Sequence, residues 1–329
     1  MNTTRPDADG FHATGRVSAY GPDAGGRGPK TGPALGNVKV AARLVAFIGA
    51  SLLALAVVPA LLYPFIRMSG SITGTRLIAF GAMSCVAMLI ATAVTVRLFS
   101  ESWRDTTRLS VDALGRWPLV GGLAAGWFAI AVPAGLLIWF GALRVVPAED
   151  GSWWTGAGLA LAILVPAALT EELALRGYAF TLLRRAWGVT TAVLLTSVAF
   201  GLLHLFNPGV TAQSVVLVSL AGVFLALVRL AFDSLWAAWL AHLGYNFVQL
   251  AVLHTPVSGL AVPQPYYRTI SNGPAWLTGG AWGPEAGAAA AFGMLGVSFL
   301  LAVHAGWVRV HRRGWRIDIT WRPRGRRES

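Results

Sequence analysis

The sequence predicts an all-α protein, a polytopic transmembrane helical bundle of about eight spans with both termini in the cytoplasm. Three observations lead to this class. Hydrophobic residues make up 55% of the 329 residues and charged residues only 12%, whereas a soluble domain carries about 25% charged residues. The apolar residues gather in runs close to the roughly 20 residues that a helix needs to cross a bilayer. Basic residues gather on one side of these runs, as the positive-inside rule describes.

Each apolar run is one predicted span, and a polar segment precedes the first. Residues 1–37 are rich in Gly and Pro and are expected to form a disordered cytoplasmic segment. They contain no apolar h-region, so no signal peptide is expected. Hydropathy places a transmembrane domain over residues 38–308 and a basic cytoplasmic tail over 309–329. The eight spans are 40–66, 76–99, 118–142, 156–180, 189–206, 211–231, 234–254 and 284–308.

The basic residues set the predicted orientation. With the N-terminus in the cytoplasm, 21 of the 26 Lys and Arg residues lie on the cytoplasmic side. The four on the opposite side are Arg67, Arg76, Arg144 and Arg268, and Arg176 lies inside a span. This asymmetry is a topology signal, so the net charge of +12 needs no nucleic-acid partner to explain it, and none is expected. The basic tail is expected to anchor the topology, or alternatively to attract anionic lipid headgroups.

Several residues outside the main polar clusters are expected to lie at the membrane interface or to serve in packing. Segment 255–283 is rich in Pro and aromatic residues, which suits a membrane interface, and it is expected to lie there as a partial lid. Glu285, His254 and His304 are expected at the interface as well, near the ends of their spans. The single cysteine, Cys85, lies inside an apolar run. It is expected to be a buried packing residue rather than a nucleophile, and it excludes an intrachain disulfide.

Polar side chains inside the apolar runs carry the functional signal, because a charge at the centre of a bilayer costs at least about 2.5–3.5 kcal/mol. The first cluster, in the fourth run, contains Glu171, Glu172 and Arg176. On a helix Glu172 and Arg176 are i and i+4 and can pair, whereas Glu171 is turned about 100° away. Glu171 then has no local cation and suits a general base. The alternative is a buried structural network of all three side chains.

Two further clusters lie in the fifth and seventh runs. His204 follows Phe200 by one helical turn, and a histidine there is either a hydrogen-bond partner between helices or a catalytic group. His242 and Asn246 are i and i+4, so both project to one face of their helix. Side by side they are donors that can hold an oxyanion in a water-poor site. The alternative is that both side chains only form hydrogen bonds between neighbouring helices.

In this order, the three clusters resemble the signature of the CPBP family of intramembrane proteases, which includes CAAX prenyl endopeptidases and bacteriocin-processing enzymes. That signature is EExxxR, then FxxxH, then HxxxN, each on its own transmembrane helix. The resemblance covers about residues 155–254, the predicted motif core. It implies a membrane endopeptidase of the glutamate type, in which Glu171 and His204 activate a water molecule. It further implies that His242 and Asn246 stabilise the tetrahedral oxyanion.

The remaining motif residues, Glu172, Arg176 and Phe200, are expected to orient the site. No cofactor is expected, but a zinc-dependent protease stays open as an alternative. Glu171 and the two motif histidines offer the oxygen and nitrogen ligands of a catalytic zinc site. The HExxH pair of many zinc proteases is absent. A serine or cysteine protease is disfavoured because no GxSxG elbow occurs.

Two functions of other classes also stay open. The first is a non-proteolytic membrane scaffold or bacteriocin-immunity protein of the same fold. The second is a transporter that uses Glu171 and Glu172 as a proton or cation site, although the sequence shows no duplicated halves. The favoured interpretation is a multi-pass protease of the cell membrane, with the bilayer and a peptide or lipid-modified protein substrate as its partners.

The protease interpretation requires a cavity between the fourth, fifth and seventh spans, and we expect it to open toward the cytoplasm. The predicted depths of the residues raise a difficulty. Glu171 lies close to the cytoplasmic end of the fourth span, whereas His204 lies about 22 Å from the start of the fifth at 1.5 Å per residue. The depths agree only if these spans extend into the cytoplasm or if a helix is broken.

Overall fold

The computed structural model of the protein describes residues 36–68, 73–262 and 265–312. These residues are mostly helical, which confirms the helical class in its coarse form. The predicted polar segment 1–37 lies almost wholly outside the described residues, and so does most of the basic tail 309–329. The last described helix continues past the predicted boundary at 308 and ends at Arg312.

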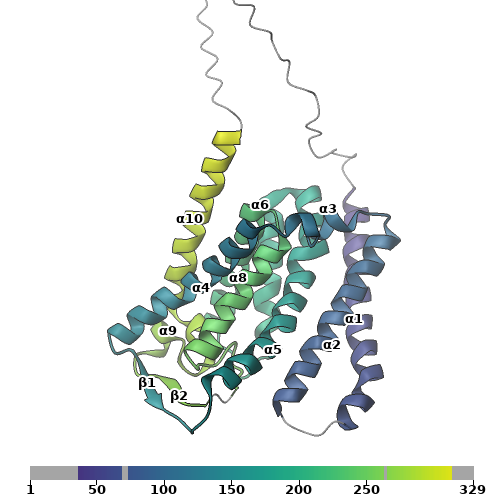
Figure 1. Ribbon diagram of the computed structural model, residues 1–329. Helices are drawn as coiled ribbons and strands as arrows, with labels where there is room; N and C mark the ends of the chain where they lie inside the picture. Colours follow the sequence, from purple (N-terminus) through teal and green to yellow (C-terminus); the bar gives the residue numbers. More distant parts are fainter. Residues whose placement is uncertain (1–35, 69–72, 263–264, 313–329) are drawn as a thin grey trace, which may run out of the picture. The chain divides into compact units, whose positions relative to one another are not determined.

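The elements follow one another along the chain as labelled in Figure 1. The α-helices are α1 (Asn37–Met68), α2 (Thr73–Leu98), α3 (Trp103–Thr107), α4 (Arg116–Trp139), α5 (Trp153–Glu172), α6 (Tyr178–Leu203), α7 (Ala212–Phe232), α8 (Leu235–Phe247), α9 (Ala275–Thr278) and α10 (Ala288–Arg312). Two π-helical turns are η2 (Leu173–Gly177) and η4 (Val248–Val252), and the 3₁₀ turns are η1 (Val111–Ala113), η3 (His204–Phe206), η5 (Gly280–Trp282) and η6 (Pro284–Ala286). The strands are β1 (Leu143–Pro147) and β2 (Tyr267–Ser271).

Within the described ranges, five stretches are long and apolar enough to cross a membrane. They are Asn37–Leu62, Gly74–Leu98, Arg116–Trp139, Trp153–Phe206 and Ala212–Phe232. The predicted fourth and fifth spans fall together in the 54-residue stretch Trp153–Phe206. The predicted eighth span falls on the shorter apolar helix Ala288–Val303 within α10, and the predicted seventh span falls on α8 with η4, which is not among the five stretches. The count of eight spans therefore stays a prediction.

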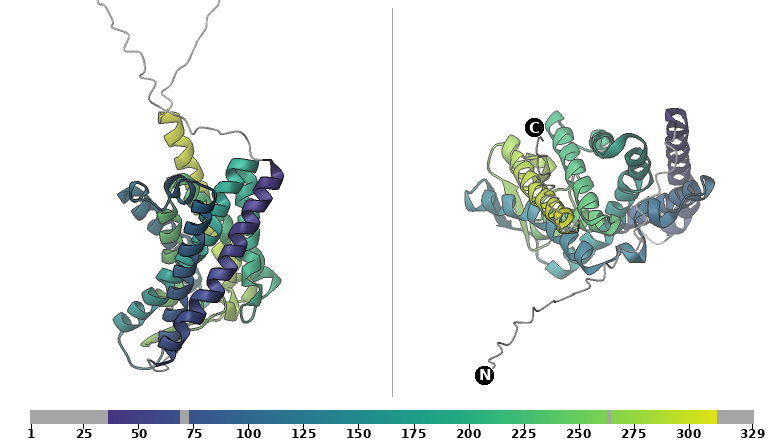
Figure 2. Two further views of the ribbon diagram at one scale, coloured as in Figure 1. Left: turned by 90° about the vertical axis from the view of Figure 1, so that its right-hand side faces the viewer. Right: turned by 90° about the horizontal axis from the view of Figure 1, so that it is seen from above.

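The first two helices have the surface of a lipid-facing pair. Helix α1 lies beside α2 (Figure 2) and exposes large apolar side chains such as Leu52 and Leu61. Apolar surface of this extent marks contact with a membrane or a partner. The single cysteine, Cys85 of α2, is buried, as predicted for a packing residue.

Helices α5 and α6 form one hairpin that turns at Gly188. The helical segment continues from Trp153 through η2, in which Gly177 has a non-helical ψ of −115°, to Gly188, whose φ of 88° also lies outside helical space. Glycine is the residue that adopts such a conformation without steric cost. Arg176 lies 12 residues before Gly188 and Phe200 lies 12 residues after it, yet their side chains are in contact. The helical segment therefore continues past the predicted end of the fourth span at residue 180, up to the turn.

This hairpin resolves the difficulty with depth. Glu171 lies 17 residues before Gly188 and His204 lies 16 residues after it. At 1.5 Å per residue, both side chains stand about 25 Å from the turn. The first arm of the hairpin extends beyond the predicted span, which is one of the two solutions that the sequence allowed.

Small residues bring the helices of the bundle close together. Gly122 and Gly126 of α4 face Ala237 and Ala241 of α8, and a Cβ atom at either glycine would overlap the alanine backbone. Pairs of small residues four apart permit this close approach of membrane helices. The same contact fixes α8, which carries His242 directly after Ala241.

The structure also contains a small antiparallel sheet, so the all-α prediction is wrong in this detail. Strand β1 pairs with β2 in the register Leu143↔Ser271 and Val145↔Thr269. The sheet ties the loop after α4 to segment 255–283. Tyr267 of β2 donates a hydrogen bond from its hydroxyl to the carbonyl of Val252 (2.6 Å), and burial raises the pKa of this phenol.

Candidate active site

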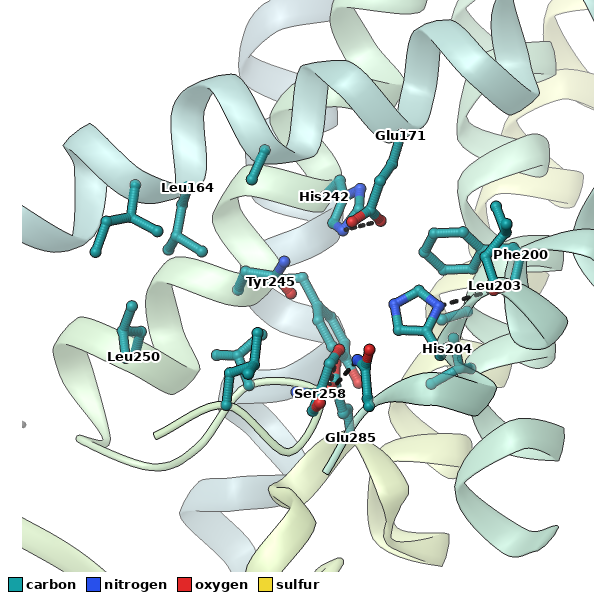
Figure 3. A pocket seen from close by; sticks show the side chains of 18 of the residues that line it. Leu164, Glu171, Phe200, Leu203, His204, His242, Tyr245, Leu250, Ser258 and Glu285 are labelled. Carbon is teal, nitrogen blue, oxygen red and sulfur yellow. Dashed lines mark hydrogen bonds and ion pairs between the residues drawn. The ribbon is translucent and has the colours of Figure 1, made fainter. Parts of the chain in front are cut away.

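A cavity of about 480 Å³ lies within the bundle. Its walls come from α5, α6 with η3, α7 and α8, and one residue of α2, Leu77, completes them. Residues of the 257–262 segment close one side. Five of the seven predicted site residues line this cavity, namely Glu171, Phe200, His204, His242 and Asn246. Figure 3 shows Glu171, His204 and His242 facing the same hollow.

The two adjacent glutamates diverge, as their helical positions require. Glu171 faces the cavity, and 36% of its side chain is exposed. Glu172 is completely buried on another face of the helix. Directly after them the helix widens into the π turn η2. Such turns occur frequently at functional sites, and no sequence signal predicted this one.

Glu172 and Arg176 form a buried ion pair. The Arg176 Nη1 donates to Glu172 Oε1 at 3.0 Å, and neither side chain is exposed. The Arg176 Nη2 donates to the carbonyl of Gly222 in α7 at 3.1 Å. Its guanidinium carbon lies 4.4 Å from the ring centroid of Phe200 in α6, a distance that suits a cation–π interaction. One arginine thus connects α5, α6 and α7 behind the cavity wall.

His242 lies between the two glutamates. Its Nδ1 is 3.0 Å from Glu172 Oε1, and its Nε2 is 3.8 Å from Glu171 Oε2. The first distance is a hydrogen bond, in which Nδ1–H donates to the carboxylate. The second exceeds hydrogen-bond length. Oε2 of Glu171 is buried without a hydrogen-bond partner in the described structure, whereas 36% of the side chain as a whole is exposed.

His204 has a defined tautomer when it is neutral. Its Nδ1 is 2.8 Å from the carbonyl oxygen of Phe200, which can only accept, so Nδ1 carries the proton. The nitrogen that remains able to accept a proton is Nε2. The Phe200 ring packs edge-on against both histidines, with centroids 4.9 Å from His204 and 5.7 Å from His242. This phenylalanine separates the two imidazoles and holds each of them in position.

Sequence reasoning missed a polar group at the other end of the cavity. Tyr245, Asn207, Ser258 and Glu285 all line it. Glu285 was expected near a membrane interface; the structure shows that it is buried within the protein, with 6% exposed. The turn η6 places it under the 257–262 segment, where it accepts hydrogen bonds from Ser258. Its position depends on a loop fold that hydropathy does not encode. The partial lid predicted in segment 255–283 corresponds to residues 257–262, which border the cavity.

The arrangement can perform acid–base chemistry on a bound molecule. It offers the Glu171 carboxylate and Nε2 of His204, neither of which has a protein hydrogen-bond partner in the described structure, and a second imidazole with an amide one helical turn further along α8. A site for zinc would need three or more acidic, histidine or cysteine side chains around one point. Among the described residues no such group is arranged to hold a metal ion.

Comparison with known proteins gives one match. The family model described as Type II CAAX prenyl endopeptidase Rce1-like matches residues 152–248. This range contains all three motifs, from Glu171 to Asn246, and it confirms the family resemblance that the motifs predicted. No curated protein and no solved structure matches the chain.

Proposed function

We propose that this chain, whose residues 152–248 match the Rce1-like endopeptidase family, is a multi-pass membrane endopeptidase of the glutamate type. One observation carries the proposal. Glu171, His204 and His242 come from three different helices and line a single cavity within the matched region. Five stretches of the described chain are apolar enough to cross a membrane, which supports a location in the cell membrane.

In the proposed reaction Glu171 and His204 activate water. Glu171 accepts a proton from a water molecule in the cavity, to which 36% of its side chain is exposed, and the water oxygen attacks the carbonyl carbon of the scissile peptide. His204 supports the same step through Nε2, because its Nδ1–H is held by the Phe200 carbonyl. The proton taken up then passes to the leaving amine when the C–N bond breaks. General acid–base catalysis of this kind contributes about 10²–10⁴-fold to a rate.

His242 and Asn246 are the proposed donors to the oxyanion. His242 keeps one proton on Nδ1 for Glu172, so a donor at Nε2 requires the doubly protonated imidazole. The ring lies between two carboxylates, with Glu172 Oε1 3.0 Å from Nδ1 and Glu171 Oε2 3.8 Å from Nε2. The Asn246 amide lies one helical turn further along the same face.

Glu172, Arg176 and Phe200 are proposed as positioning residues. Glu172 holds His242 through Nδ1, and Arg176 neutralises the charge of Glu172. Phe200 contacts both imidazoles and the guanidinium group. The proposed substrate is a peptide or a lipid-modified protein, as the family match suggests.

The first test replaces Glu171 by glutamine in the full chain and measures cleavage of a peptide library in detergent and in vesicles. Turnover should fall by about 10²–10⁴-fold, since the proton acceptor is lost while the side chain keeps its size. The matched control is Glu149→Gln, which removes an exposed carboxylate and should leave turnover unchanged.

Equal turnover by the Glu171→Gln protein would remove the assigned role. A wild-type protein that cleaves no peptide, but keeps its biological phenotype when Glu171 is replaced, would instead support the scaffold or immunity function. Flux of protons or cations in proteoliposomes that depends on Glu171 would support the transporter.

The zinc alternative uses the same side chains and calls for a separate measurement. For the proposed mechanism, dialysis against an excess of chelator should leave peptide cleavage unchanged, because Glu171 itself takes the proton. Loss of cleavage that added zinc restores would contradict the metal-free mechanism and favour a zinc-dependent protease.

A further inference from the structure

The proposed catalytic cavity holds more negative charge than the reaction requires. Two carboxylates line it, Glu171 and Glu285, and none of the described residues that line it is Lys or Arg. Arg176 is completely buried and pairs with Glu172. The doubly protonated His242 of the proposed mechanism offsets the charge of Glu171, whereas Glu285 has no positive partner among the described residues, and a water-poor cavity with such a carboxylate attracts cations. The proposed mechanism uses Glu171 and leaves Glu285 without a role.

Glu285 is a buried carboxylate with only neutral partners. Its Oε1 accepts hydrogen bonds from the Ser258 hydroxyl (2.8 Å) and the Ser258 amide, and its Oε2 accepts one from the Gln249 side chain (3.2 Å). No described basic side chain lies within ion-pair distance of it. Burying a carboxylate without a positive partner is costly, so a cation at this position would stabilise the site. Each oxygen of a carboxylate can accept two hydrogen bonds, and Oε2 has accepted one.

Tyr245 provides an independent observation at the same place. It is 4% exposed, it lines the cavity, and its hydroxyl is buried without a hydrogen-bond partner. Figure 3 shows its side chain extending from α8 toward Ser258 and Glu285. A buried tyrosine hydroxyl usually has a partner. Its oxygen can accept a hydrogen bond from a bound ammonium or guanidinium group, and its ring face can bind the same cation.

We propose that Glu285 and Tyr245 form a subsite for the basic side chain of a lysine or arginine in the peptide substrate. This inference rests on the proposed function and adds to it a substrate class. Glu285 and Glu171 share one cavity of about 480 Å³, so the basic residue lies within a few positions of the bond that is cleaved. Glu285 supplies the counter-charge, and the Tyr245 hydroxyl accepts one hydrogen bond.

The experiment uses the full-length protein and a series of labelled peptides. Each peptide carries lysine, or its uncharged counterpart norleucine, at one of the three positions on either side of the scissile bond. At one position lysine should raise kcat/KM by about tenfold or more, the difference expected for one charge-assisted hydrogen bond. Glu285→Gln should bring the lysine-to-norleucine ratio close to one, and Asp150→Asn, which removes an exposed carboxylate away from the cavity, should leave the ratio unchanged.

Tyr245→Phe is the second variant, because it removes a hydroxyl that has no hydrogen bond to lose. It should fold like the wild type and lower the ratio in part. Glu285→Gln also weakens the hold on Ser258, so a purely structural role would lower cleavage of both peptides equally and leave the ratio intact. That result would overturn the subsite.

Fluorescence anisotropy measures binding of the same peptides, and this measurement distinguishes the subsite from the endopeptidase activity. Cleavage without a lysine preference at any position would overturn the subsite and keep the endopeptidase. Lysine-selective binding that Glu285→Gln abolishes, without cleavage of any peptide, would keep the subsite and overturn the endopeptidase. Absence of both cleavage and selective binding would overturn both proposals.

Discussion

Arg176 stabilises the proposed site through contacts with three helices. Its guanidinium group pairs with Glu172, donates to the Gly222 carbonyl and lies over the Phe200 ring. Glu172 in turn holds His242. A change at Arg176 therefore alters the position of an imidazole that it does not touch.

Removing this arginine should destabilise the protein strongly. Arg176→Met leaves Glu172 buried without its cation, which costs about 3–5 kcal/mol. The double variant Glu172→Gln with Arg176→Met should recover most of this loss, because no unpaired charge remains. Unfolding in detergent measures both. The control is Arg185→Met, which removes a partly exposed pair with Glu101 and should cost at most about 1 kcal/mol. Equal losses of stability for Arg176→Met and Arg185→Met would contradict a stabilising role for the buried contacts of Arg176.

For individual residues, the sequence predicted contacts within one helix well and contacts between distant segments poorly. Helical spacing predicted that Glu172 pairs with Arg176 and that Glu171 diverges from them. The three motifs predicted five residues that now line one cavity, and their catalytic roles stay predictions. The contact between Glu285 and Ser258 was not predicted, because it depends on a loop conformation with positive φ at Ser258 (51°) and Gly259 (78°). No periodicity reports such a turn.

Helices α4 and α8 illustrate how an element positions a functional side chain. Their contact runs through Gly122 and Gly126 against Ala237 and Ala241, and His242 is the next residue on α8. Added volume at this contact must push α8 away from α4 and move the imidazole with it.

Gly126→Ala should lower the stability of the protein by about 1–3 kcal/mol, the usual cost of overpacking. It should also lower peptide cleavage, because the new methyl group overlaps the Ala241 backbone. Gly135→Ala is a control in the same helix, since nothing lies near its added Cβ. It should be neutral or stabilise the helix by up to about 1 kcal/mol. A Gly126→Ala protein as stable and active as the control would contradict the close contact.

Elements were predicted best where one apolar run forms one helix. The hydropathy pattern located α1, α2, α4 and α7 within a few residues. It placed the end of the fourth span at 180 because the residues before Gly188 are amphipathic, with Arg184 and Arg185 among them. The strands β1 and β2 are too short for a hydropathy window, and their pairing joins residues 120 to 128 positions apart.

For the whole molecule, two expectations from the sequence conflict. The charge asymmetry places the N-terminus and the Gly188 turn in the cytoplasm. The cavity extends from the level of Glu171 to Asn207 and the 257–262 segment, on the side of the bundle where β1 and β2 lie (Figure 1). With that orientation the cavity lies toward the side away from the cytoplasm. The charge-based topology and a cavity open to the cytoplasm cannot both hold.

Cysteine labelling decides the orientation. Cys85 is the only cysteine and is buried, so a Cys85→Ala background permits single reporters. With the charge-based topology, Glu149→Cys should react with a membrane-impermeant maleimide in intact cells, and Thr190→Cys should react only after permeabilisation. Both positions are exposed. The reverse pattern would place β1 and β2 in the cytoplasm and contradict the topology derived from the basic residues.

The hairpin that turns at Gly188 restricts how the length of this chain can change. Because Glu171 and His204 stand almost equally far from the turn, an insertion of four residues in one arm would shift one of them by about 6 Å along the helix axis. Equal insertions in both arms would preserve their alignment and lengthen only the turn end of the hairpin. Natural variants of this protein should therefore gain or lose residues in the two arms together.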